Sequence, residues 1–269
     1  MPEGHKTHFI AKEHTKLLGG KRLRVSSPQG RFAVDAVFVD NRTLDRVVAA
    51  GKHIFYLFDN ASIVHVHLGR YGLYREQSGL PEPRGLVRMR LYDGATSIDL
   101  NGPTQCRVIS SSQRAEIESK LGPDPLAGGK WKKAWDLIKV SKQPIGALLL
   151  DQTVIAGIGN IFRAELLFEL RINPLTRGCE LSEIEFRGLW KALLRMMNLG
   201  LKHGKIITVT SREVGKPLMQ LESKERFRIY GKDTCPQCGD AIGVIIVAAR
   251  NLYVCPACQD VPRIELKNV

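Results

Sequence analysis

Apolar residues recur first at helical spacing and then in short strand-like runs along the N-terminal part of the chain. Residues 7–18 form the helical stretch, and Gly19-Gly20 suits its C-terminal cap. Short runs rich in β-branched and aromatic residues follow at 32–39, 53–58, 63–67, 86–92 and 96–100. Because Gly, Asp and Asn turns separate these runs, the pattern predicts an antiparallel sandwich or barrel of about 110 residues.

The apolar spacing becomes helical in the second half of the chain. Helices are predicted at 114–121, 134–140, 145–150, 161–170 and 182–201. The Pro- and Gly-rich stretch 121–129 predicts a linker between the halves. An irregular basic stretch follows residue 204, and a cysteine-containing module spans 227–259. The chain is therefore predicted to be of the α+β class.

Four cysteines form two pairs, Cys235-Pro-Gln-Cys238 and Cys255-Pro-Ala-Cys258, separated by sixteen residues. This spacing matches a tetrahedral four-cysteine zinc site. Disulfide bonding is the alternative, but the polar N-terminus has no hydrophobic signal core, and CxxC pairs in intracellular chains favour metal or redox roles. Four thiolates leave zinc no open position, so we expect one structural Zn²⁺.

Composition narrows the possible partners of this chain of 269 residues. No apolar run approaches the roughly 18 residues that a transmembrane helix needs, so we expect a cytoplasmic protein. The 40 Lys and Arg residues exceed the 27 Asp and Glu residues, which gives a net charge of +13. Such a charge favours a polyanionic partner, because each phosphate contact releases condensed counterions. A merely basic soluble protein is the alternative, and membrane-surface binding is less favoured because no long amphipathic basic helix is present.

The N-terminal residues Pro2-Glu3-Gly4 carry a possible nucleophile. Initiator Met before Pro is commonly removed, which would expose Pro2 as a secondary amine that titrates near pH ~8. Condensation of this amine with a sugar C1′ gives an iminium, an electron sink for elimination of a 3′ phosphate. Glu3 lies beside it as an acid and base. These residues alone favour the alternative, an ordinary exposed N-terminus.

Two further motifs suggest phosphate binding. Gly157-Ile-Gly159-Asn160 places a turn between two predicted helices, where backbone N–H groups and the amide of Asn160 can meet a phosphate. Arg250 lies in the presumed hairpin between the cysteine pairs, where its guanidinium can bind phosphate bidentately. A helix C-cap and a solvated arginine are the ordinary alternatives.

The order of these motifs resembles the formamidopyrimidine-DNA glycosylase / endonuclease VIII family of base-excision repair enzymes. The matching stretches span essentially the whole chain: Pro2–Gly4, Gly51-Lys52, His67–Gly72, Leu121–Leu126, Leu150–Gln152, Ala156–Ile161, and Ile229–Gly231 before the cysteines and Arg250. The resemblance implies a catalytic β-sandwich headed by a helix (residues 1–120), a helix–two-turns–helix domain (130–222) and a zinc finger (225–260). DNA would lie across the cleft between the halves.

Roles for individual residues also follow from the resemblance. Pro2 corresponds to the Schiff-base nucleophile, Glu3 to the proton donor and Lys52 to a lysine that contacts phosphate at the lesion. Asn160 and Arg250 correspond to phosphate ligands that pinch the backbone around an everted nucleotide. Eversion is required because C1′ of a stacked, paired base is inaccessible.

Several details favour the endonuclease VIII branch. Pro-Glu-Gly replaces the Pro-Glu-Leu of the formamidopyrimidine enzymes, and Arg70-Tyr71 occupies the place of the wedge that fills the gap left by the flipped base. The stretch 101–107 lacks the Phe of their Arg-Arg-Phe-Gly motif.

One feature departs from the family as a whole. The family's glutamate near the N-terminus is replaced where His5-Lys6 stands, and Lys6 offers a phosphate contact instead.

The expected function is therefore a bifunctional DNA glycosylase and abasic-site lyase that removes oxidised bases, pyrimidines favoured, and cuts the strand by β,δ-elimination. The expected partner is damaged double-stranded DNA, bound by a monomeric, nucleoid-associated bacterial protein. The alternatives are a catalytically inactive damaged-DNA-binding protein, or an enzyme that prefers 8-oxoguanine and formamidopyrimidines. A metal-dependent nuclease is disfavoured because no carboxylate cluster has a telling spacing.

Four other residues receive more ordinary interpretations. His65 and His67 face the same way on a predicted strand, and we expect packed or phosphate-neighbouring histidines rather than metal ligands. Arg163 and Glu165 follow Asn160 on the same predicted helix, where they would pair with neighbours, and Glu165 would support the preceding turn.

Overall fold

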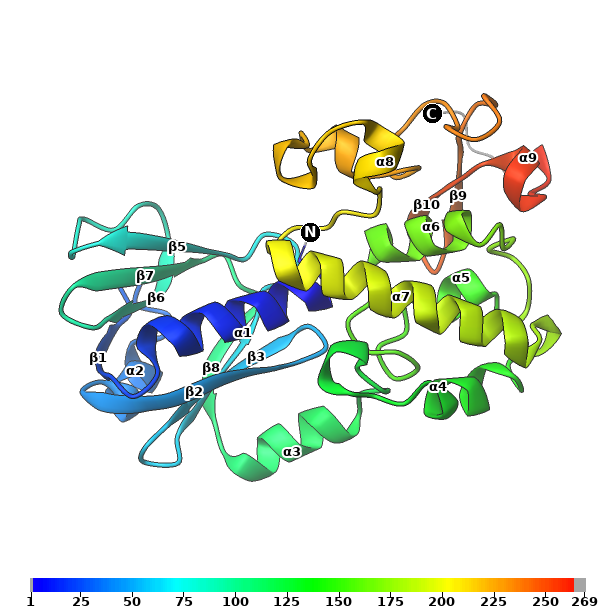
Figure 1. The fold of residues 1–269 in the computed structure, drawn as a ribbon. Coiled ribbons are helices and arrows are strands. Elements are labelled where there is room, and N and C mark those ends of the chain that lie inside the picture. Colours follow the sequence, from blue (N-terminus) through cyan, green and yellow to red (C-terminus); the bar gives the residue numbers. More distant parts are fainter. Residues whose placement is uncertain (1, 264–269) are drawn as a thin grey trace. The chain divides into compact units, whose positions relative to one another are not determined.

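The chain folds into two units, residues 1–120 and residues 121–269. The computed structural model describes residues 2–263. An antiparallel sheet fills the first unit (Figure 1). Eight strands hydrogen-bond in the order β5-β7-β6-β1-β2-β3-β4-β8. The elements of this unit are α1 (Gly4–Leu18), β1 (Arg22–Ser26), α2 (Ala33–Val39), β2 (Arg42–Ala50), β3 (His53–Phe58), β4 (Ile63–His67), β5 (Leu73–Ser78), β6 (Val87–Tyr92), β7 (Thr96–Asn101), β8 (Gln105–Ile109) and α3 (Ser111–Ser119).

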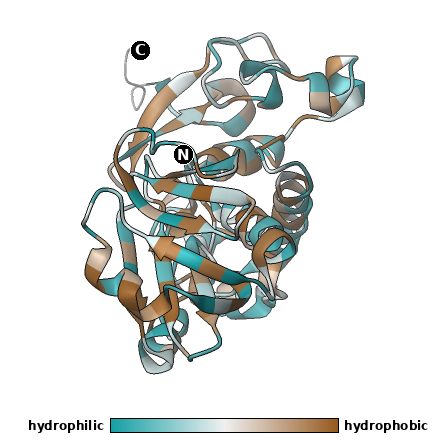
Figure 2. Ribbon diagram, turned by 90° about the vertical axis from the view of Figure 1, so that its left-hand side faces the viewer, coloured by the Kyte–Doolittle hydropathy of each residue, from teal (hydrophilic) through white to brown (hydrophobic). Residues whose placement is uncertain are grey.

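The strands are striped by hydropathy, as Figure 2 shows for the sheet of the first unit. In β1 exposed and buried positions alternate, with Leu23 and Val25 facing inward. Alternation of this kind directs every second side chain to one face. Helix α1 packs its buried residues, among them Ile10 and Leu18, into the same core, which explains why the expected leading helix belongs to the sheet domain.

One predicted strand, 32–39, is wrong: Ala33–Val39 is the helix α2. Its buried residues Ala36 and Val39 lie three apart, while Val34 and Val37 are 78% and 76% exposed. Burial at that interval belongs to one helical face and not to a strand. The β-branched composition of the run misled the prediction, because tertiary context overrides β-propensity.

The second unit is mainly helical and ends in a hairpin. Its elements are η1 (Pro125–Ala127), α4 (Trp131–Ile138), α5 (Ile145–Leu148), α6 (Asn160–Glu169), η2 (Gly178–Glu180), α7 (Glu183–His203), α8 (Ser211–Val214), η3 (Leu218–Gln220), η4 (Lys224–Arg226), β9 (Gly243–Val247), β10 (Arg250–Val254) and α9 (Pro256–Gln259). Ser182 opens the long helix α7 with a capping box, and Gly204 closes it with φ 65°. Met196 and Met197 of α7 are fully buried.

One hydrophobic core unites the helices and the hairpin of the second unit. Phe162 of α6 and Leu193 of α7 belong to the same buried cluster as Ile245 and Leu252 of the hairpin. The stretch 121–129, predicted to be a linker, is also folded into this unit, where the carbonyl of Pro123 accepts a hydrogen bond from the N–H of Ala156. Among residues 2–263, no helix is both long and apolar enough to cross a membrane.

Candidate functional site

The first part of the site is the N-terminal end of α1. Glu3 is the N-cap residue, has an extended backbone (φ −124°, ψ 177°) and is fully buried. Its carbonyl accepts hydrogen bonds from the N–H groups of Lys6 (2.8 Å) and Thr7 (3.4 Å). Pro2 therefore lies directly before the N-terminus of α1. Met1 lies outside the described residues.

The turn that carries Lys52 is hydrogen-bonded to this end of α1. Ala50 pairs with His53, so Gly51 and Lys52 form the turn between β2 and β3. Gly51 has φ 55°, a left-handed conformation that glycine adopts without strain. The hydroxyl of Thr7 lies 2.6 Å from the carbonyl oxygen of Gly51. The first unit thus brings the Pro2-Glu3 end of the chain to the Gly51-Lys52 turn.

Three histidines on β3 and β4, namely His53, His65 and His67, form a cluster near this turn. The Nδ1 of His53 and the Nε2 of His65 are 2.9 Å apart, and the ring centroids of His53 and His67 are 5.0 Å apart. Burial is the main cause that lowers the pKa of His53 to about 4 and of His65 to about 3, so these rings are neutral at pH 7. Within residues 2–263 only the four finger cysteines bring three or more metal-binding side chains together. His65 and His67 therefore belong to a cluster of packed rings on β3 and β4.

Arg70 and Tyr71 lie on a tight loop between β4 and β5. The Nδ1 of His67 accepts from the N–H of Gly69 (3.2 Å), and the N–H of Gly72 donates to the carbonyl of Leu68 (2.9 Å). Tyr71 is 73% exposed, and the guanidinium of Arg70 lies 5.4 Å from the centre of its ring. The loop therefore presents an aromatic ring to solvent on a fixed backbone.

In the second unit, the predicted phosphate ligand Asn160 begins α6 and bonds to the hairpin. Its Nδ2 donates to the carbonyl of Asn251 (2.8 Å), and its Oδ1 accepts from the guanidinium of Arg163 (2.5 Å). Arg163 is fully buried and also donates to three backbone carbonyls, those of Gly146, Val247 and Asn251. These bonds tie the N-terminal turn of α6 to both strands of the hairpin.

Arg250 stands at the first position of β10, directly after the hairpin turn. Ala248 and Ala249 form that turn with φ 53° and 56°, the positive values that a two-residue hairpin turn of this type requires. The side chain of Arg250 is exposed. Because Asn160 and Arg163 hold the neighbouring residue Asn251, the tip with Arg250 is fixed beside the N-terminus of α6.

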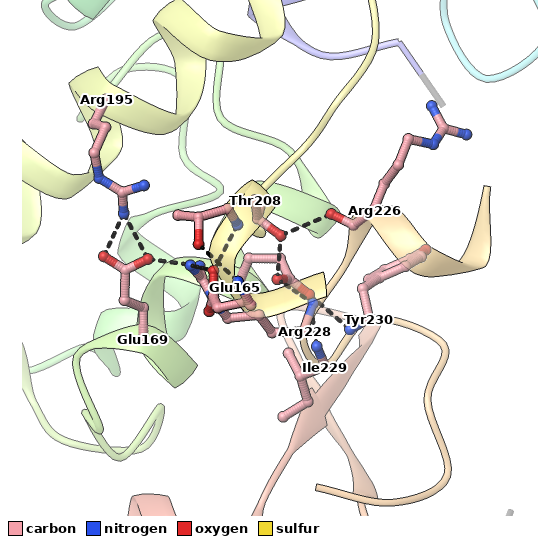
Figure 3. A network of polar contacts seen from close by, with 10 residues as sticks. Glu165, Glu169, Arg195, Thr208, Arg226, Arg228, Ile229 and Tyr230 are labelled. Carbon is pink, nitrogen blue, oxygen red and sulfur yellow. Dashed lines mark hydrogen bonds and ion pairs between the residues drawn. The ribbon is translucent and has the colours of Figure 1, made fainter. Parts of the chain in front are cut away.

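Glu165 is a buried anchor whose main partners sequence reasoning missed. Its carboxylate, which is fully buried, accepts from the hydroxyl of Thr208 (2.6 Å) and from the N–H groups of Arg228 (2.8 Å), Ile229 (2.9 Å) and Tyr230 (2.8 Å) (Figure 3). Four donors satisfy a buried carboxylate that would otherwise destabilise the core. The expected support of the preceding turn is not among these contacts, which instead hold the chain segment that leads into the cysteine module.

A chain of ion pairs surrounds Glu165. Glu169 lies between Arg195 (2.5 Å) and Arg228 (2.7 Å), and Arg228 also pairs with Glu213 (2.8 Å), as Figure 3 shows in part. Hydrogen bonding from Arg228 is the largest cause that lowers the pKa of Glu213, to about 2. The sequence signal for this network is the acidic Glu165 between apolar neighbours, Ala164 before it and Leu166 to Phe168 after it.

The four predicted cysteine ligands come together in the second unit. Their sulfur atoms all lie within 4.8 Å of one another, with Cys235 and Cys258 at 3.8 Å and Cys238 and Cys255 at 3.5 Å. Tetrahedral zinc with Zn–S bonds of about 2.3 Å separates its sulfurs by about 3.8 Å, so this set fits zinc. All four are free thiols, which excludes the disulfide alternative in this structure.

Two family models match this chain. Residues 121–212 match the formamidopyrimidine-DNA glycosylase H2TH domain, and residues 232–261 match the zinc finger found in FPG and IleRS. The α+β fold, the helix–two-turns–helix domain and the four-cysteine finger expected from the sequence are thereby confirmed.

Curated relatives and solved structures agree with these family matches. Endonuclease 8 1 of Mycobacterium tuberculosis is 43% identical over 268 residues, covering 96% of this chain and 100% of the relative. Formamidopyrimidine-DNA glycosylase of Thermus thermophilus is 27% identical and covers 96% and 98%. The Lactococcus lactis Fpg in complex with DNA containing N7-benzyl-Fapy-dG shares the fold, with a TM-score of 0.81, 21% identity and coverage of 96% and 99%. The chain therefore belongs to the formamidopyrimidine-DNA glycosylase / endonuclease VIII family of DNA repair glycosylases.

Proposed function

We propose that this protein is a bifunctional DNA glycosylase and abasic-site lyase that removes oxidised bases, pyrimidines favoured, from double-stranded DNA. The observation that carries the proposal is the head of α1, where Pro2 precedes the buried N-cap Glu3 and the turn of Lys52 is hydrogen-bonded to the same helix end. An amine, a carboxylate and a cation so grouped have the chemistry for attack on a sugar carbon.

In the proposed mechanism the secondary amine of Pro2 attacks C1′ after removal of Met1. The C1′–N bond to the base breaks, and the base leaves with the proton that the Pro2 nitrogen releases on attack. Glu3 protonates the sugar ring oxygen, so the ring opens and a cationic iminium forms between Pro2 and C1′. Glu3, now a carboxylate, accepts the C2′ proton as the C3′–O bond to the 3′ phosphate breaks, and a second elimination expels the 5′ phosphate. Water then hydrolyses the iminium, which releases the sugar fragment as an aldehyde and restores the secondary amine.

The second unit would hold the DNA backbone. Asn160 has two amide hydrogens, of which the bond to Asn251 uses one, and Arg250 is exposed beside it. Together with Lys52 these residues would bind phosphates around the everted nucleotide, while Arg70 and Tyr71 fill the vacated stack. The net charge of +13 supports a DNA partner, and we propose that a monomer acts at the bacterial nucleoid.

One structural Zn²⁺ would be held by Cys235, Cys238, Cys255 and Cys258. A zinc ion with four thiolates supplies cross-linking and no open coordination position. Its proposed part is to fix the hairpin that presents Arg250, since β9 and β10 lie between the two cysteine pairs.

Borohydride trapping on duplex DNA tests this proposal. Wild-type protein should form a covalent adduct with abasic-site DNA, whereas Pro2→Gly should form far less. Brief EDTA treatment that leaves the four-cysteine zinc in place should not stop cleavage, because no step uses a catalytic metal. A panel of duplexes with oxidised pyrimidines, 8-oxoguanine and formamidopyrimidines then ranks the lesions. If the wild type binds these duplexes but neither nicks nor becomes trapped, the protein is a damaged-DNA-binding relative and not an enzyme.

A further inference from the structure

We infer that Thr7 is a positioning residue that fixes the Lys52 turn against the Pro2-Glu3 end of α1. The inference rests on the proposed function, because it assigns Thr7 a part in that same site. No motif in the sequence singles out Thr7. Its place follows from contacts within the first unit alone.

The hydroxyl of Thr7 stands between two backbone carbonyls that adjoin the expected catalytic residues. Its Oγ1 lies 2.8 Å from the carbonyl oxygen of Gly4 and 2.6 Å from that of Gly51. Gly4 directly follows Glu3, and Gly51 directly precedes Lys52. Thr7 is 1% exposed, so water cannot easily replace the hydroxyl. One side chain therefore connects the peptide next to the acid with the peptide next to the lysine.

The bond to Gly51 goes beyond ordinary helix chemistry. A threonine in a helix commonly bonds to a carbonyl three or four residues earlier, which accounts for the contact with Gly4. The contact with Gly51 spans 44 residues and is the shorter of the two. Because the hydroxyl has one hydrogen, both carbonyls share it, and the position of Gly51 is thereby coupled to the first turn of α1.

A second threonine on α1 provides an internal comparison. The Oγ1 of Thr15 accepts from the N–H of Val47 (2.8 Å) and donates to the carbonyl of Val47 (3.0 Å). Both threonines thus attach the same helix to the same β2–β3 hairpin through backbone groups. Thr15 lies eight residues further along, which is about 12 Å at 1.5 Å per residue, and so lies away from Pro2. Of these two threonines, only Thr7 bonds to residues that adjoin Glu3 and Lys52.

This arrangement predicts an effect on the chemical step rather than on DNA affinity. Thr7 is buried and has no surface with which to hold DNA. Loss of its hydroxyl would release the turn of Lys52 relative to Glu3 by a fraction of an ångström. Since a misplacement of about 1 Å can cost about 100-fold in rate, we expect a loss of about tenfold.

The test compares Thr7→Val, Thr7→Ser and the matched control Thr15→Val in the full-length chain. The measured quantities are the single-turnover rate of cleavage of abasic-site duplex, the rate of borohydride trapping, the Kd for the same duplex, and the Tm. Thr7→Val should cleave and be trapped about tenfold more slowly with Kd unchanged within about twofold. Thr7→Ser keeps the hydroxyl and should retain the wild-type rate within about twofold. Thr15→Val should lower Tm and leave the rate intact.

Each outcome decides between the positioning role and a merely structural one. Equal cleavage rates for Thr7→Val and Thr15→Val would overturn the inference, as would a slow Thr7→Ser. A double variant with Lys52→Ala adds a second check, because Thr7→Val should cost much less once the lysine is absent. If Thr7→Val does not fold, Thr7→Ala with Thr15→Ala as its control is judged by the same outcomes. Failure of the wild type to be trapped refutes the proposed function instead.

Discussion

Both units present the N-terminal end of a helix, α1 in the first and α6 in the second, and they hold these ends by different means. The N-terminal end of α1 is held against the β2–β3 hairpin by the neutral hydroxyl of Thr7. Helix α6 uses the buried charges of Arg163 and Glu165 against the β9–β10 hairpin and the segment before it. A neutral hydrogen bond contributes about 1 kcal/mol, whereas breaking a buried charged network costs about 3–5 kcal/mol.

The two units should therefore respond differently to substitutions near their expected functional residues. In the second unit the groups that position the expected phosphate ligands also hold the core together, so alterations there should act on folding first. In the first unit the expected wedge and lysine lie on turns at the end of the sheet, so alterations there should act on chemistry or DNA binding first.

Loss of the metal should have the largest effect and should fall on the second unit. Cys235 and Cys255 belong to the same buried cluster as Phe162 of α6, and structural zinc contributes about 10–16 kcal/mol of apparent binding free energy in finger peptides. Chelation or Cys238→Ser should therefore lower the Tm of the second unit and abolish DNA binding. Calorimetry and fluorescence anisotropy measure these two effects.

The exposed Cys179, which lies outside the cluster, supplies the control. Cys179→Ser should keep both the Tm and the Kd for DNA. An unchanged Tm after complete removal of zinc would contradict the shared-core argument.

Glu165→Gln should destabilise the second unit by about 3 kcal/mol. An amide offers one acceptor oxygen and turns an NH₂ group toward backbone donors that the carboxylate now satisfies. Urea unfolding measures the change in free energy. Glu183→Gln, at an exposed position in the first turn of α7, is the matched control and should cost only a few tenths of a kcal/mol. Equal losses for the two variants would show that the buried network adds nothing.

Lowering the pH should destabilise the first unit before it destabilises the second. Burial lowers the pKa of His5 to about 3 and of His14 to about 4 in the first unit, both from the ordinary histidine value of 6.5. Folding therefore favours the neutral rings. Their contribution to stability is complete above pH 6.5. It is lost as the pH falls toward 4, because the unfolded chain then binds protons that the buried rings do not. The pKa of Glu213 in the second unit is lowered from 4.5 to about 2, so its contribution is lost only as the pH falls from 4.5 toward 2.

Hydrogen exchange followed by mass spectrometry between pH 7 and pH 3 tests this order, after correction for the intrinsic rates. Protection should fall in peptides of the first unit before it falls in α6 and α7. His14→Gln should flatten the dependence in the first unit, while His203→Gln, in the last turn of α7, should leave it unchanged. Simultaneous loss of protection in both units would contradict the assignment.

Tyr71→Ala should have the smallest effect on stability, within about 0.5 kcal/mol, because the ring is 73% exposed. It should nevertheless weaken lesion binding by about 1–3 kcal/mol if the ring stacks on bases. Leu80→Ala, which changes another exposed apolar side chain in the first unit, is the control for Tyr71→Ala. Urea unfolding measures stability, and DNA titration measures affinity.

Asn160→Ala should lower both stability and DNA affinity, because it removes a partner of the buried Arg163. The same two measurements apply.

The sequence alone predicted those features that depend on residues close together in the chain. The spacing of the cysteine pairs indicated a metal site. The Pro2-Glu3-Gly4 motif indicated a reactive N-terminus only together with the order of the other motifs along the chain. Helical periodicity located α6 and α7. The cysteine pairs and the two helices depend on contacts within a few turns of helix or on one tight turn, so spacing along the chain is sufficient to find them.

Only the tertiary structure decided the rest. The run 32–39 became a helix because of the surface against which Ala36 and Val39 pack, which composition does not contain. Thr7 meets Gly51 across 44 residues, Glu165 meets Ile229 across 64, and Arg163 meets Asn251 across 88. Hydrogen bonds over such separations leave no periodic trace in the sequence. A single buried polar side chain therefore acquires its partner, and its role, only when the chain has folded.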